Sequence, residues 1–126
     1  MAYLWVAIGG ALGSVARFWF ANLMAVLVGA DFPWGTLIIN IAGSFVISFF
    51  GASTDRFNLP YEARVFVTVG LCGGFTTFSS FSLQTIDLIR TGQPTRAELY
   101  VAASVLLCLA GCAAGFLAAA AIARAP

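Results

Sequence analysis

Two phenylalanines set among hydroxyl side chains are the residues of this chain best suited to handle an ion. The run Gly73-Gly-Phe-Thr-Thr-Phe-Ser-Ser-Phe-Ser82 places Phe78 and Phe81 three residues apart, on the same side of a helix. Aromatic rings have positive edges and negative faces, so edges aimed at a narrow path favour an anion over a cation. A lone pair of phenylalanines usually packs against protein or lipid, but the many hydroxyls beside this pair favour a polar path.

The same run is a poor continuous helix. Gly73 and Gly74, followed by Thr76 and Thr77, weaken the hydrogen-bond ladder of a helix. A broken helix exposes backbone carbonyls, which lipid excludes unless the break is buried in protein or lies beside a coordinated ion. We therefore expect a third span that is broken at mid-membrane, with a buried and functional break.

Asn40 and Arg17 are two further polar residues in apolar surroundings. Asn40 belongs to a stripe, with Thr36, Ser44 and Ser48, that recurs every four residues. Its amide has two donors and an acceptor that its own helix cannot satisfy, so it faces either a partner helix or a permeating ion. Arg17 either extends to a membrane interface or lines a water-filled vestibule, where its charge would concentrate anions.

Four apolar segments must position these residues. Of the 126 residues, 61% are hydrophobic and 9% are charged, so lipid has to cover most of the surface. A bilayer core requires roughly 20 apolar residues in each helix, and the sequence divides into such lengths at about 3–28, 34–54, 61–90 and 98–123. We expect an all-α integral membrane fold, with one four-helix transmembrane domain over residues 1–126. Short connections predict that successive spans run up and down.

Composition argues against several functions. The net charge of +1 provides no basic face for nucleic acid. The sequence has no histidine, so neither a metal cluster nor a nucleophile paired with a base can be assembled, and we do not expect an enzyme. Cys72, Cys108 and Cys112 all lie in apolar segments, where a free thiol behaves as a small hydrophobe.

Positive charges are nearly balanced between the two ends of the predicted bundle. One end carries Arg56, Arg64 and Arg124, and the other carries Arg90 and Arg96, with Arg17 joining them if it lies near that end of the first span. Because the arginine and lysine bias normally sets orientation, this balance either permits insertion both ways up or is an accident of a chain with few charges. Four spans make a very small transporter, so we expect a pore to need at least two copies.

Three motifs resemble those of the small bacterial fluoride channels called Fluc or CrcB. They are Gly-x-x-x-Arg from Gly13 to Arg17, Trp34-Gly-Thr-Leu-Ile-Ile-Asn40, and the run from Gly73 to Ser82. The resemblance covers essentially the whole chain. It implies a multi-pass fluoride-selective channel of the bacterial cytoplasmic (inner) membrane, exporting fluoride passively down its electrochemical gradient and lowering cytoplasmic fluoride. It also implies an antiparallel, dual-topology homodimer with two pores built from both copies.

The resemblance also implies roles for individual residues. Phe78 and Phe81 would be the pore phenylalanines, Asn40 the amide donor to fluoride, and Arg17 a vestibule residue. The whole predicted fluoride pathway consists of Arg17, Thr36, Asn40, Phe78, Phe81, Ser82 and Gln84.

A structural sodium ion at the dimer interface is a further implication. Backbone carbonyls of Gly73 and Thr76 would hold it on the two-fold axis, where two copies present hard oxygen ligands symmetrically. The sequence departs from the family at Gln84, where Glu is common, and at Cys108 and Cys112, which align with pore-side serines. These departures affect the expected polar track rather than the phenylalanine pair.

Two other functions compete with a channel. A small multidrug antiporter also has four helices, but it needs a membrane-embedded carboxylate for proton exchange. The first span has none, and Asp87 near the end of the third is a poor substitute. A nonconducting assembly subunit would tolerate replacement of Asn40 and of the phenylalanines without loss of transport.

Overall fold

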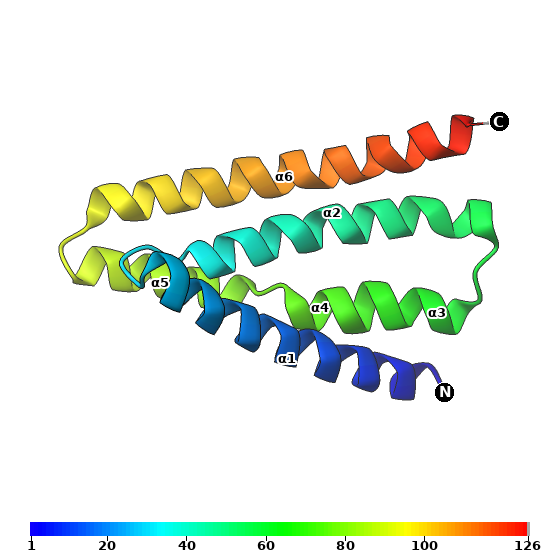
Figure 1. The fold of residues 1–126 in the computed structure, drawn as a ribbon, viewed down its shortest axis with the longest axis horizontal. Coiled ribbons are helices and arrows are strands. Elements are labelled where there is room, and N and C mark those ends of the chain that lie inside the picture. The colour runs from blue at the N-terminus through cyan, green and yellow to red at the C-terminus, as the bar shows by residue number, and fades with distance from the viewer. Residues whose placement is uncertain (126) are drawn as a thin grey trace.

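The chain folds into long helices that lie side by side (Figure 1). The computed structural model describes residues 1–125, apart from the side chain of Asp55. Within that part of the chain, four helical stretches are long and apolar enough to cross a bilayer, which confirms the predicted all-helical fold. They are Ala2–Val28, Trp34–Thr54, Tyr61–Arg90 and Pro94–Arg124.

The third stretch is divided, whereas the other three are single helices. Both termini and the α2–α3 connection lie at one end of the bundle, and the α1–α2 and α5–α6 connections lie at the other (Figure 1). Successive long helices are therefore antiparallel. The elements in chain order are α1 (Ala2–Val28), α2 (Trp34–Phe57), α3 (Tyr61–Val65), the π-helix η1 (Phe66–Leu71), α4 (Cys72–Phe75), α5 (Phe78–Arg90) and α6 (Pro94–Arg124).

Helix α6 begins ahead of the apolar stretch that the sequence predicts at 98–123. Its first residue is Pro94, and proline suits this position because the first N–H groups of a helix have no partner within it. The first turn therefore extends outside the apolar segment and carries Arg96. The Nη1 of Arg96 donates to the carbonyl of Asp31 at 3.3 Å, which ties α6 to the α1–α2 connection.

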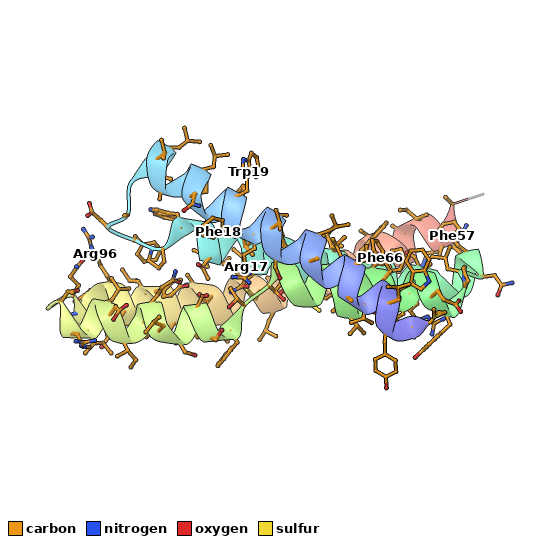
Figure 2. The ribbon with its side chains drawn as sticks, turned by 90° about the horizontal axis from the view of Figure 1, so that it is seen from below. Arg17, Phe18, Trp19, Phe57, Phe66 and Arg96 are labelled. Carbon is orange, nitrogen blue, oxygen red and sulfur yellow. The ribbon has the colours of Figure 1, made fainter. Side chains whose placement is uncertain are left out.

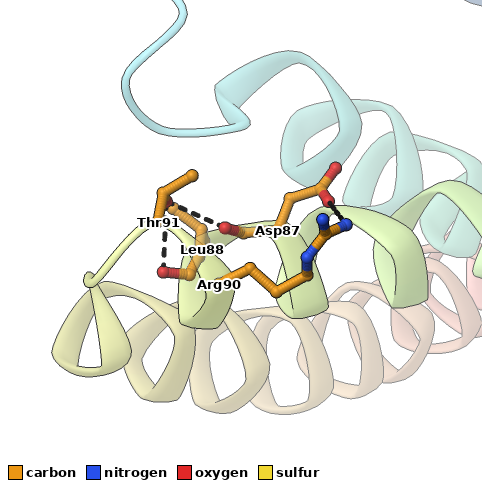
Figure 3. A network of polar contacts seen from close by, with 4 residues as sticks. All are labelled: Asp87, Leu88, Arg90 and Thr91. Carbon is orange, nitrogen blue, oxygen red and sulfur yellow. Dashed lines mark hydrogen bonds and ion pairs between the residues drawn. The ribbon is translucent and has the colours of Figure 1, made fainter.

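Local polar contacts surround the C-terminal end of α5 (Figure 3). Thr91 Oγ1 donates to the carbonyls of Asp87, at 2.8 Å, and Leu88, at 3.3 Å. Both carbonyls also accept from backbone N–H groups, Asp87 from Thr91 at 3.0 Å and Leu88 from Gln93 at 2.8 Å, so the hydroxyl adds to the backbone bonds at this helix end. Arg90 lies 3.7 Å from Asp87 in an exposed ion pair. Asp87 is therefore an exposed residue at the end of the third stretch.

Glycines bring α1 into close contact with the third stretch. A Cβ at Gly13 would meet the carbonyl oxygen of Leu71, and a Cβ at Gly74 would meet the carbonyl oxygen of Gly10. Because lipid provides no hydrophobic drive between helices, their association depends on such close backbone approach. Any larger residue at either position would push α1 away from α4.

Helices α2 and α6 pack together in the same way. A Cβ at Gly115 would meet the carbonyl oxygen of Phe45, and Ser48 Oγ donates to the carbonyl of Cys112 at 2.6 Å. The polar stripe of α2 is thus used partly for helix packing.

Candidate functional site

The centre of the site is an interruption between α4 and α5. Helix α4 ends at Phe75 and α5 begins at Phe78, with Thr76 and Thr77 in extended conformations between them. Thr77 caps the N-terminus of α5, because its Oγ1 accepts from the backbone N–H of Ser80 at 3.1 Å. The two glycines before the interruption and the capping threonine after it explain why the helix stops and restarts here.

Asn40 of α2 holds one side of the interruption. Its Nδ2 donates to the carbonyl of Thr77 at 3.1 Å, and its Oδ1 accepts from the N–H of Thr77 at 2.8 Å. Both backbone groups of an extended residue are thereby satisfied within the protein. Asn40 therefore contacts a neighbouring helical stretch of its own chain. One N–H of its amide has no hydrogen-bond partner among residues 1–125.

Arg17 of α1 holds the other side. Its Nε donates to the carbonyl of Gly74 at 3.0 Å, a carbonyl that the end of α4 leaves without a backbone donor. Arg17 lies on the side of α1 that faces the other helices, whereas Trp19 points away from them (Figure 2). The guanidinium thus braces the interruption, a role that the sequence did not predict.

Two carbonyl oxygens at the interruption remain available. The carbonyl of Cys72 accepts from the backbone N–H of Thr76, at 2.9 Å, and from its Oγ1, at 2.8 Å, while Gly74 is occupied by Arg17. Within the described part of the chain, no hydrogen-bond donor reaches the carbonyl of Gly73 or that of Thr76. Backbone carbonyls of this kind are hard ligands for a cation.

The interruption borders a cavity of about 410 Å³, here called the inner cavity. Five of the predicted site residues line it together, contributed by α2, by α4 and α5, and by the interruption between them. They are Asn40, Gly73, Thr76, Phe78 and Phe81. The ring centroids of Phe78 and Phe81 are 5.4 Å apart, and Phe78 is 77% exposed. The two rings are thus neighbours at an open side of the cavity.

The remaining predicted residues lie elsewhere. Thr36 and Gln84 line a second cavity of about 410 Å³, the end cavity, close to the α1–α2 connection. Neither cavity is lined by Arg17 or Ser82. Ser82 Oγ donates to the carbonyl of Phe78 at 3.0 Å, so this hydroxyl is used within its own helix.

Tyr100 of α6 contacts both Phe81, which lines the inner cavity, and Gln84, which lines the end cavity. It is absent from the predicted pathway. It is fully buried, its hydroxyl donates to Gln84 Oε1 at 2.8 Å, and its ring centroid lies 5.1 Å from that of Phe81. A signal was present in the sequence, because Tyr100, Ser104 and Cys108 recur every four residues and so share a face of α6. Ser104 and Cys108 line the inner cavity.

Comparison with known proteins identifies the family. The sequence profile described as "CrcB-like protein, Camphor Resistance (CrcB)" matches residues 4–116. This chain belongs to the CrcB-like family. The motif-based prediction is therefore confirmed.

Relatives of this CrcB-like protein bear the name fluoride-specific ion channel FluC. That of Methylocella silvestris is 55% identical over 112 residues, 86% of each chain. That of Rhodospirillum rubrum is 53% identical over 114 residues, 88% of each chain. That of Methylobacterium radiotolerans is 50% identical over 118 residues, which cover 91% of this chain and 82% of the relative.

Proposed function

We propose that this CrcB-like protein is a fluoride-specific ion channel that exports fluoride passively down its electrochemical gradient. The observation that carries the proposal is its identity of 50–55% to relatives of that name over at least 86% of the chain. Hydrogen fluoride crosses membranes as a neutral weak acid and ionises inside the cell. An open exit for the anion therefore lowers cytoplasmic fluoride, and this is transport rather than enzymatic catalysis.

The inner cavity provides the groups that such a path needs. The rings of Phe78 and Phe81 offer positive edges, and Asn40 keeps one N–H that Thr77 does not use. These partial positive charges replace part of the water that surrounds a small anion. Because they are partial rather than full charges, they bind the anion weakly enough for it to move on through the channel. Thr36 and Gln84 would continue the path into the end cavity.

An antiparallel, dual-topology homodimer in the bacterial inner membrane forms part of the proposal. Phe78 is a large aromatic side chain that is 77% exposed beside the hydroxyls of Ser79 and Ser80. A second copy would enclose it and complete a path from both chains, giving two pores. The near balance of arginines between the two ends of the bundle supports insertion in both orientations.

A structural sodium ion fits the interruption. The carbonyls of Gly73 and Thr76 lack donors within residues 1–125, and two copies around a two-fold axis would present both pairs to one cation. When bound, the ion would offset the negative ends of these carbonyl dipoles within the membrane. Arg17 and Asn40 would keep the neighbouring backbone in position.

Fluoride efflux from liposomes, followed with a fluoride electrode, tests the function. We expect rapid release of fluoride and retention of chloride. Phe81→Ile removes a ring edge, and Asn40→Asp keeps the acceptor for Thr77 but removes both amide donors, so each variant should impair release. Phe116→Ile, at an exposed position of α6, is the matched control. Equal chloride leakage, or absence of fluoride release, would contradict the assignment.

A further inference from the structure

The inner cavity contains two thiols to which the proposed fluoride path assigns no role of their own. Cys72, at the start of α4, is 4% exposed, and Cys108 on α6 is half-buried. Both are free cysteines, and both line the cavity. Thiolate sulfur is a soft ligand that prefers soft metal ions to hard ones. The cavity thus combines hard backbone oxygens at the interruption with soft sulfur ligands.

A buried hydroxyl indicates that a polar species enters this cavity. Ser104 is 7% exposed, and its Oγ has no hydrogen-bond partner in the described part of the chain. Buried polar groups are normally paired with protein, water or a ligand, so a water molecule or an ion is expected beside this oxygen. Ser104 and Cys108 are four residues apart and lie on the same face of α6. An aqueous ion that reaches Ser104 is therefore next to the thiol of Cys108.

We propose that Cys72 and Cys108 form a binding site for a soft, thiophilic metal ion such as Hg²⁺, and that the bound ion closes the inner cavity. Each sulfur gives up its proton to solvent as it binds, so one Hg²⁺ and two thiols yield one mercury dithiolate and two protons. No oxidant or reductant is required. The metal site itself is independent of the proposed function, whereas the closure rests on it.

Cys112 provides the matched control. It lies one turn beyond Cys108 on the same helix and does not line the inner cavity. Its backbone carbonyl accepts from Ser48 where α2 and α6 pack together. The two cysteines of α6 thus have the same chemistry and lie one turn apart, but only Cys108 borders the cavity.

Binding is tested on the purified protein with Hg²⁺ alone, by native mass spectrometry and by titration of free thiols. We expect one tightly bound Hg²⁺ with the loss of two free thiols, and the same result for Cys112→Ser. Cys108→Ser and Cys72→Ser should each bind at least about tenfold more weakly, because one soft ligand becomes a hard hydroxyl. Cys108→Ala serves as a second variant for the same position. Wild-type affinity in the Cys108 or Cys72 variants, or weakened binding in Cys112→Ser, would overturn the site.

Closure is tested by fluoride efflux from liposomes before and after Hg²⁺ is added. Efflux through the wild type and through Cys112→Ser should stop and should recover on addition of a dithiol chelator, whereas Cys108→Ser should continue to conduct. Unchanged efflux with mercury bound would overturn closure. A protein that releases no fluoride before Hg²⁺ is added would contradict the proposed function, and the binding measurement would still decide the metal site.

Discussion

Replacing Arg17 by lysine separates two properties of the arginine, its positive charge and the Nε–H that it donates to Gly74 at 3.0 Å. A lysine ammonium is a compact charge on a flexible stem and does not place an N–H where Nε lies. A hydrogen bond from a charged donor contributes about 1.5–3 kcal/mol. Its loss therefore changes the equilibrium between the interruption held in place and the interruption displaced by roughly tenfold to a hundredfold. We therefore expect Arg17→Lys and Arg17→Gln to lower fluoride efflux similarly, by about tenfold or more.

The assay is the initial rate of fluoride efflux from liposomes at low and high ionic strength, with protein folding checked by size-exclusion chromatography. A vestibule charge acts through its field, which salt screens, whereas a direct hydrogen bond in a partly buried place is screened much less. Arg96→Lys is the matched control, because Arg96 is exposed and its bond to Asp31 is distant from the interruption. Full activity in Arg17→Lys, with a strong salt dependence that Arg17→Gln loses, would refute the brace and favour the vestibule.

Three other changes probe the surroundings of the interruption. Tyr100→Phe keeps the ring contact with Phe81 but leaves Gln84 Oε1 without its donor at 2.8 Å, so thermal unfolding in detergent should show a loss of about 1 kcal/mol; an unchanged melting temperature would argue against this link. Gly13→Ala places a Cβ against the Leu71 carbonyl and should abolish the folded protein, whereas Gly51→Ala, which meets open space, should be tolerated. Equal yields of both would show that α1 can shift. Removal of sodium should lower the stability of the dimer in detergent, and identical dimer fractions with and without sodium would contradict the proposed cation site.

Much of the architecture was readable from the sequence because it depends on local properties. The length and apolarity of the segments determine four membrane-length helices, since lipid has to replace a charged exterior. The spacing of Phe78 and Phe81 places their rings together on one helix face. The motifs around Arg17, Asn40 and the run from Gly73 to Ser82 were sufficient to recognise the family, which is confirmed by the match over residues 4–116.

The tertiary structure decided what these polar residues touch. Arg17 and Gly74 are 57 residues apart in the chain, and Asn40 and Thr77 are 37 apart, so no periodicity predicts that each pair is hydrogen-bonded. Local sequence likewise does not predict that Tyr100 is buried against α5. The residues next to a tyrosine in an apolar helix do not decide whether it faces lipid, a neighbouring helix or a cavity. Sequence spacing fixes which side chains share a helix face. At the interruption, some backbone groups have no partner within their own helix. Only the packing of the helices decides which of these groups the side chains reach.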